Sequence, residues 1–245
     1  MKFIYFVVAC SVLLLSSFAH AKVDTAELQF SLCETNPQHV VERLGASMLD
    51  GRGKKEMREV YYLETLTRDL QRRGAVMRFR ETEKGIKSSA KFAYQYNEQI
   101  PDDEFDELDV NCEVDAYLSR AKIGCSVKHD PSELGKVSRE QKKFFKKNGI
   151  DPQIWDETRL WGPVTDLDWS IEISGYLFSL DTFYLPTGQV FMELSVRVSL
   201  VDALQMQQQI LARINAAQLQ LCESQSGVTK KILDHYLGSA DDLSQ

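Results

Sequence analysis

Residues 60–80 read VYYLETLTRDLQRRGAVMRFR, and the last six of them place two arginines on one face of a strand. Side chains alternate between the faces of a β-strand, so Arg78 and Arg80 share a face while Met77 and Phe79 point the other way. At a rise of roughly 3.3 Å per residue, the two arginines lie about 7 Å apart along the strand. Planar guanidinium groups suit a ligand that carries several phosphate or carboxylate oxygens. This stretch therefore predicts a polyanion site.

The composition is typical of a soluble globular protein. Of the 245 residues, 43% are apolar and 27% are charged, and the formal net charge is −7. An acidic chain is a poor candidate for binding nucleic acid through its overall field, so we expect no nucleic-acid partner. An anion site in such a chain has to be a local, enclosed cluster of basic side chains.

The N-terminus is typical of a signal peptide. Lys2 precedes the apolar run FIYFVVACSVLLLSSFA, and Ala19-His20-Ala21 provides a small-residue cleavage site. We predict a signal peptide over residues 1–21, an exported protein that is periplasmic or secreted, and no membrane contact after cleavage. An uncleaved anchor and a lipoprotein signal at Cys10 are the alternatives, but apolar residues continue well past Cys10. Without repeats or linkers, residues 22–245 are predicted to form a single domain; the sequence leaves the oligomeric state open.

Four cysteines remain after cleavage: Cys33, Cys112, Cys125 and Cys222. In an oxidising compartment they allow three disulfide connectivities. Cys112 and Cys125 lie in two alternating segments joined by a short polar turn, which favours Cys112 with Cys125 and, by elimination, Cys33 with Cys222. A zinc site is the rival interpretation, and the absence of CxxC spacing disfavours it.

Alternating segments dominate the chain and predict strands. They lie at residues 25–33, 55–64, 75–82, 87–95, in a hairpin over 112–128, and at 167–174, 176–185 and 189–199. Helices are expected at 36–46, 66–73, 132–148, 201–223 and 227–237, with Trp155 and Trp161 in an irregular connection. The acidic run at 101–109 is predicted to be a solvated loop, since it lacks the spacing of a calcium loop.

Most of these strands have an apolar face and a face that carries charge. One interpretation is an antiparallel sheet with its polar face in water. The other is a closed barrel with a polar interior and helices over its apolar exterior.

A family resemblance favours the barrel. VYYLETLTRDLQRRGAVMRFRE (60–81) resembles the YFDTPDxDLxRxGxxLRxR stretch of the CYTH superfamily, the triphosphate tunnel metalloenzymes. Weaker pieces follow in the family's order: AELQFSL (26–32), SAKFAY (89–94), CEVDAY (112–117), FSLDTFY (178–184) and FMELSV (191–196).

The resemblance implies an α+β fold: an eight-stranded antiparallel β-barrel of the triphosphate-tunnel type with helices packed outside and two C-terminal helices. It implies a small polyanionic ligand, triphosphate or polyphosphate, with Mg²⁺ or Mn²⁺ or no metal at all. By position it assigns phosphate binding to Arg78, Arg80, Lys91, Arg73 and Lys230, with Arg72 as a further candidate. It assigns metal binding to Glu27, Glu113, Asp181 and Glu193, and catalysis, in an active member, to Glu27, Glu113 and Asp115.

The chain departs from the family pattern at its most functional positions. The ExExK motif of the first strand reads Glu27-Leu28-Gln29-Phe30-Ser31, and the late ExE motif reads Glu193-Leu194-Ser195. Hard divalent cations prefer charged oxygen ligands, so each lost carboxylate weakens metal affinity. We therefore expect a tunnel that binds a polyanion with catalysis weakened or lost. The alternatives are a metal-dependent tri- or polyphosphate phosphohydrolase, and an inert barrel in which Arg78 and Arg80 pair with Glu113, Glu193 or Asp181.

Overall fold

The computed structural model describes residues 23–48, 55–96, 100, 105 and 107–238. The predicted signal peptide and most of the acidic run at 101–109 lie outside the described residues. No helix in the described part of the chain is long and apolar enough to cross a membrane.

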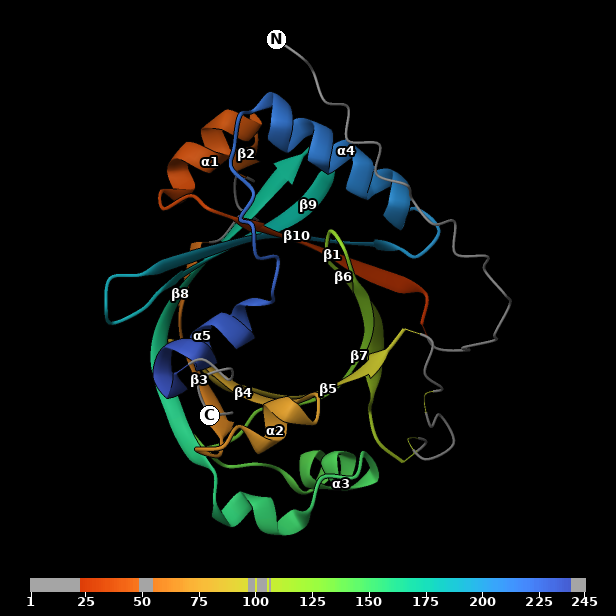
Figure 1. The fold of residues 1–245 in the computed structure, drawn as a ribbon, viewed down its shortest axis with the longest axis vertical. Coiled ribbons are helices and arrows are strands. Elements are labelled where there is room, and N and C mark those ends of the chain that lie inside the picture. Colours follow the sequence, from red (N-terminus) through yellow and green to blue (C-terminus); the bar gives the residue numbers. More distant parts are fainter. Residues whose placement is uncertain (1–22, 49–54, 97–99, 101–104, 106, 239–245) are drawn as a thin grey trace.

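The described strands close into a barrel (Figure 1). Its ring has the order β8-β3-β4-β5-β7-β6-β1-β10-β9, and β9 pairs again with β8. A short strand, β2 (Ser47–Met48), adds to the side of β8. The ring strands are β1 (Thr25–Leu32), β3 (Lys55–Glu64), β4 (Ala75–Thr82), β5 (Gly85–Gln95), β6 (Asn111–Ala116), β7 (Ala121–His129), β8 (Arg159–Ile173), β9 (Tyr176–Tyr184) and β10 (Val190–Ser199).

The prediction of eight antiparallel strands is wrong in two details. The described ring contains nine strands, and β1 pairs with β6 in parallel, Glu27 opposite Asp115. The two details have one cause. Each antiparallel neighbour reverses the strand direction, so a closed ring with an odd number of strands requires a parallel pair. The sequence pattern itself indicates nine strand segments, and the count of eight came from the resemblance.

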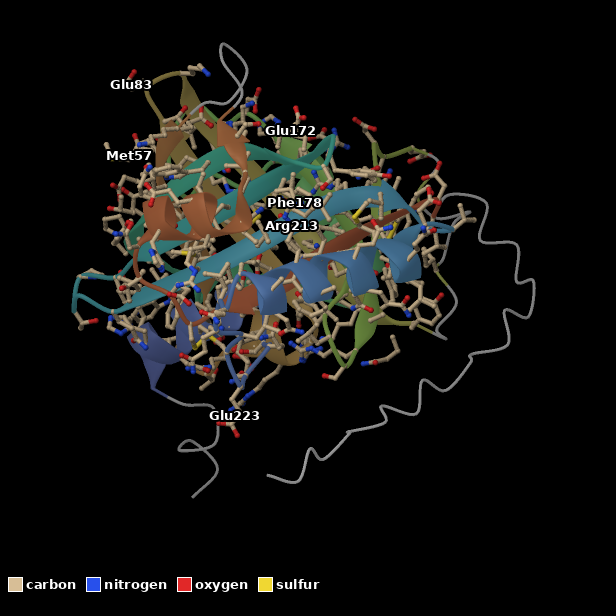
Figure 2. The ribbon with its side chains drawn as sticks, turned by 90° about the horizontal axis from the view of Figure 1, so that it is seen from above. Met57, Glu83, Glu172, Phe178, Arg213 and Glu223 are labelled. Atoms are coloured by element: carbon tan, nitrogen blue, oxygen red, sulfur yellow. A yellow bond between two sulfur atoms is a disulfide. The ribbon has the colours of Figure 1, made fainter. Side chains whose placement is uncertain are left out.

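Helices cover the apolar exterior of the barrel in two places. Helices α1 (Pro37–Leu44) and α4 (Ala203–Ala216) pack on the outer face of β1, β8, β9 and β10, where Phe30, Ile171 and Leu194 are fully buried. Both helices lie over this wall in Figure 2. Helix α3 (Arg139–Lys147) packs Phe144 and Phe145 against β4, β5 and β7. The apolar strand faces therefore point outward, which confirms the closed barrel over the open sheet.

Residues 64–74 form a buried turn between β3 and β4. Glu64 is fully buried, and its carboxylate accepts hydrogen bonds from the backbone N–H groups of Thr65, Leu70 and Gln71 at 2.8, 3.0 and 2.8 Å. These bonds satisfy the free N–H groups of the short helix α2 (Asp69–Arg72). Gly74, with φ of 77°, then turns the chain into β4, and the Cβ of any other residue there would lie 3.0 Å from the Ala93 carbonyl oxygen.

The same turn holds the C-terminal helix α5 (Val228–Leu237). The side chain of Arg68 is fully buried, donates to the Leu233 carbonyl oxygen at 3.0 Å, and also contacts Asp234 and the Gly238 carbonyl. In Figure 1 α5 lies within the outline of the ring, beside β3. Its apolar side packs on Val60, Val164 and Phe183.

Helix boundaries follow local capping more closely than the apolar pattern. Helix α3 begins at Arg139 and not near residue 132, because Ser138 and Gln141 form a reciprocal capping box. Helix α4 ends at Ala216 and not near residue 223. The chain after it returns to β1, where the Cys222 N–H donates to the Ser31 carbonyl at 2.9 Å.

Strand β8 begins at Arg159, eight residues before its predicted start. The interpretation of Trp161 as part of an irregular connection is therefore wrong. Val60 pairs with Val164 and Tyr62 with Trp161, so Gly162 and Pro163 together lie opposite a single residue of β3. This bulge accommodates a proline, which lacks a backbone N–H for the ladder.

Both predicted disulfides are confirmed. Cys112 and Cys125 are direct partners across the β6–β7 pair, with Cα atoms 4.0 Å apart. Cys33 and Cys222, with Cα atoms 4.8 Å apart, tie the end of β1 to the segment that leads into α5.

Candidate functional site

A cavity of about 780 Å³ occupies the interior of the barrel. Its described lining holds ten basic and six acidic side chains, although the whole chain is acidic. The basic residues are Arg58, Arg72, Arg78, Arg80, Lys91, Arg120, Lys122, Lys128, Arg197 and Lys230; the acidic residues are Glu27, Glu113, Asp115, Asp168, Asp181 and Glu193. The cavity is thus a local basic enclosure. A second cavity, of about 620 Å³ between α1 and α4, contains none of the predicted site residues.

We call the inner face of β4, β5 and β7 the basic wall; its basic residues are Arg78, Arg80, Lys91, Lys122 and Lys128. Strand register places them in rows. Arg78 pairs with Ser89, which pairs with Lys128, so these three residues cross the wall side by side. The alternation of β4 directs both arginines inward while Met77 and Phe79 are fully buried outside.

Arg78 and Arg80 form no hydrogen bond or ion pair with any other described residue, and the Nε atom of Arg80 is buried without a partner. Burial and the nearby charge of Arg78 lower the pKa of Arg80 to about 10, so it remains a cation at neutral pH. Unpaired cations in an enclosed space are unfavourable. The pairing that an inert barrel requires is absent among the described residues: Glu113 pairs with Arg197, and Asp181 pairs with Arg58.

We call the opposite inner face, on β8, β9 and β10, the acidic wall. Asp168, Asp181 and Glu193 are neighbours across three strands, and Asp166 lies one inward position further along β8. Arg58 of β3 enters this group: its Nη1 lies 3.7 Å from Asp166 Oδ2 and 3.8 Å from Asp181 Oδ1, and its Nη2 contacts Asp168.

Burial raises the pKa values of the acids on this wall. The pKa of Asp166 rises to about 8, first by burial and then by the charge of Asp181. The pKa of Glu193 rises to about 8 through burial and through Asp181 and Glu27. Burial and Asp168 raise the pKa of Asp181. Both Asp166 carboxylate oxygens and the Oε2 of Glu193 lack a hydrogen-bond partner among the described residues. Protons therefore neutralise part of this wall near neutral pH.

A third group, the three-carboxylate cluster, consists of Glu27, Glu113 and Asp115, whose carboxylate oxygens lie within 4.8 Å of one another. Arg197 Nε donates to Glu113 at 2.7 Å, and its Nη2 lies 2.9 Å from Glu27. Lys91 Nζ donates to Asp115 at 2.8 Å. Each carboxylate therefore already holds a cation of this chain.

The cavity brings together all but one of the predicted site residues. Arg73 is exposed at the C-terminal end of α2 and does not line the cavity, whereas its neighbours Gln71 and Arg72 do. Lys230 of α5 lines the cavity, and its Nζ is paired with Asp234 at 2.7 Å.

The sequence interpretation missed Arg58, Asp166, Asp168 and Arg197 as site residues. The alternation in KEMREVYY would have placed Arg58 on the polar face of β3. Asp166 and Asp168 alternate in TDLDW. Asp166 lies before the predicted strand start at residue 167, which was placed too late because Gly162 and Pro163 interrupt the pattern of the strand. Arg197 continues the inward series of Glu193 and Ser195.

No protein-family model matches the chain, and no curated protein matches its sequence. Several solved structures resemble it, among them the following two. A candidate adenylyl cyclase from Hippeastrum, described as having a dominant triphosphatase activity, matches with a TM-score of 0.58 and 11% identity over 88% of this chain and 96% of that chain. A candidate adenylate cyclase from Bacillus halodurans matches with a TM-score of 0.56 and 11% identity over 85% and 96%. At this identity the likeness shows the fold alone: the chain shares the barrel fold of these two proteins, which agrees with the tunnel-type barrel that the sequence resemblance implied.

Proposed function

We propose that this chain is a divergent, exported CYTH-type protein whose tunnel binds triphosphate, polyphosphate or another small polyanion, with catalysis weakened or lost. One observation carries the proposal: Arg78 and Arg80 face a basic enclosure and form no hydrogen bond or ion pair with any described residue. Anions that bridge such cations relieve their repulsion and supply charge-assisted hydrogen bonds.

The dimensions of the basic wall suit a ligand with more than one anionic group. Arg78 and Arg80 start about 7 Å apart along β4, and Lys128 lies two strands away in the same row as Arg78. A cavity of about 780 Å³ falls within the range of about 300–1,000 Å³ that small-molecule sites occupy. A single phosphate would contact only part of this wall, whereas a chain of phosphates could contact several of its cations.

The proposed export draws support from the cysteines. Two disulfides within one domain are typical of proteins that fold outside the reducing cytoplasm. The disulfides and the signal-like N-terminus both support the proposed periplasmic or secreted location of residues 22–245.

The proposed loss of catalysis draws support from one cross-strand pair. Gln29 of β1 lies directly opposite Ser195 of β10. Both stand at positions where the family pattern has a carboxylate, so two neutral side chains meet where two metal ligands would. Lower affinity for a divalent cation is the expected consequence.

The alternative is a metal-dependent tri- or polyphosphate phosphohydrolase. Glu193 favours it, since this residue lines the cavity and its Oε2 lacks a hydrogen-bond partner among the described residues. When bound, a divalent cation would polarise the phosphoryl group. Phosphate release from tripolyphosphate or ATP with Mg²⁺ or Mn²⁺ would select this alternative.

Calorimetric titration with tripolyphosphate, with and without Mg²⁺, tests the binding proposal. The wild type should bind one tripolyphosphate per chain, and Arg78→Ala/Arg80→Ala should lose most of that affinity. The matched control is Lys142→Ala/Lys146→Ala, which removes two exposed charges from α3 outside the barrel. Absence of binding by the wild type, or equal loss in both double variants, would refute a tunnel site.

A further inference from the structure

We infer that Arg197 stands in the place of a divalent cation among Glu27, Glu113 and Asp115, so that the three-carboxylate cluster is a metal-free charge centre. By composition alone the cluster resembles a site for a hard cation, since three carboxylates converge within 4.8 Å. The contacts of each carboxylate contradict that assignment.

Arg197 bridges two of the three carboxylates. Its Nε and Nη2 contact the two oxygens of Glu113 at 2.7 and 3.3 Å, which is the bidentate arrangement that a planar guanidinium forms with a carboxylate. The same Nη2 lies 2.9 Å from Glu27 Oε1. The other oxygen of Glu27 accepts a hydrogen bond from Gln29 Nε2 at 3.0 Å. All four oxygens of Glu27 and Glu113 are thus engaged.

Lys91 binds the third carboxylate. Its Nζ lies 2.8 and 2.7 Å from the two oxygens of Asp115. The absence of a side chain at Gly124 makes room for this pair: a Cβ there would lie 2.4 Å from Lys91 Cε and 2.5 Å from Asp115 Oδ2. The ion pair is therefore built into the wall formed by β5, β7 and β6.

Strand register explains why the Arg197 side chain lies at the three-carboxylate cluster. Along the β1–β10 ladder, Glu27 pairs with Arg197 and the next inward pair is Gln29 with Ser195. One pair is neutral, and the pair beside it consists of an acid and a base. A divalent cation would have to displace Arg197 and Lys91 and find further oxygen ligands, because Mg²⁺ requires about six. The residues present do not fit a metal at this cluster.

The test removes the internal cation and asks whether a metal replaces it. Mn²⁺ binding is measured from the loss of the free-ion electron paramagnetic resonance signal, without any phosphate ligand. Arg197→Gln should bind one Mn²⁺ at least about tenfold more tightly than the wild type, since it frees the carboxylates of Glu27 and Glu113. Arg197→Gln/Glu113→Gln should lose that gain, and Arg197→Lys, which keeps the charge, should resemble the wild type.

Two results would overturn the inference. One is a folded Arg197→Gln variant, confirmed by circular dichroism, that gains no Mn²⁺ site. The other is Mn²⁺ binding by the wild type that Glu113→Gln abolishes. The second measurement does not require Arg197→Gln to fold: equal Mn²⁺ binding by the wild type and Glu113→Gln supports the metal-free cluster.

These measurements are independent of the proposed ligand. Failure of tripolyphosphate to bind would refute the proposed function and leave the Mn²⁺ results unchanged. Conversely, a metal at the wild-type cluster would overturn this inference while the basic wall still bound tripolyphosphate.

Discussion

The basic and acidic walls of the tunnel differ in whether their charged side chains have ion-pair and hydrogen-bond partners. On the acidic wall, Arg58 reaches Asp166, Asp168 and Asp181, and Ser179 donates to Asp168 and Asp181 at 2.5 and 3.1 Å. On the basic wall, Arg78 and Arg80 have no partner among the described residues. Folding therefore pairs much of the acidic charge internally and leaves the two arginines of β4 without a hydrogen bond or ion pair to any described residue. Local violations of this kind are expected where a protein binds something.

The largest expected effect comes from removing the uncompensated charges. Arg78→Ala/Arg80→Ala should reduce tripolyphosphate affinity by roughly 100- to 10,000-fold, because each of the two charge-assisted contacts contributes about 1.5–3 kcal/mol. The ligand-free variant should unfold at the same temperature as the wild type or higher, since the mutual repulsion of the two cations is gone.

Isothermal titration and thermal unfolding together check this prediction. The Lys142→Ala/Lys146→Ala control should change neither quantity by much, because both lysines are exposed outside the barrel. A marked loss of ligand-free stability in the arginine variant would contradict the comparison, since it would mean that these cations stabilise the fold.

Breaking a compensated charge should have the opposite profile. Glu113→Gln removes the bidentate partner of Arg197 and should lower the free energy of unfolding by about 1–2 kcal/mol. The effect is kept modest because 61% of the Arg197 side chain is exposed and water screens the pair. Urea unfolding measures the change. Glu133→Gln, at an exposed pair with Lys136, is the control and should differ from the wild type by less than about 0.5 kcal/mol.

The pH dependence of stability sharpens the description of the acidic wall. The pKa of Asp166 and of Glu193 is about 8 in the folded chain, against ordinary values of 3.8 and 4.5. Well below pH 3.8 both groups are protonated in both states. As pH rises toward 8 the unfolded chain ionises first, so stability falls, by at most about 1.4 kcal/mol per pH unit for each group, and then levels off.

Asp166→Asn should reduce this loss of stability between pH 5 and 8. Urea unfolding across that range is the measurement, with Asp109→Asn on an exposed loop as the control. An unchanged pH profile in Asp166→Asn would show that this carboxyl is ionised in the folded protein.

The smallest effect is expected at the rim of the basic wall. Lys128 is exposed at the end of the row that contains Arg78. Lys128→Ala should weaken tripolyphosphate binding by about two- to fivefold at low salt and less at high salt, because exposed charges are screened within about 8–10 Å. Lys136→Ala on the outer surface should have no effect. Equal losses for Lys128→Ala and Arg80→Ala would contradict a deep site.

Local pattern predicted much of the barrel. Alternation in residues 75–80 placed Arg78 and Arg80 on one face, and the Cys112 and Cys125 segments paired as expected. Boundaries were less accurate where local capping decides them, as at the end of α4, where Gln218 has a φ of 52° and the Leu219 N–H donates to the Ile214 carbonyl at 3.1 Å. Because of the bulge at Gly162 and Pro163, the first eight residues of β8, which include Asp166, were not predicted to be part of the strand.

The sequence by itself determined which side chains share a strand face, because alternation is a property of the local backbone. Only the tertiary structure decided what those faces meet. Closing the ring brought Glu27 of β1 beside Glu113 and Asp115 of β6, and placed Arg197 of β10 between two of them. It left Arg78 and Arg80 without a partner among the described residues. Charge compensation depends on distances of a few ångströms between residues far apart in the chain, and only the closed barrel sets those distances.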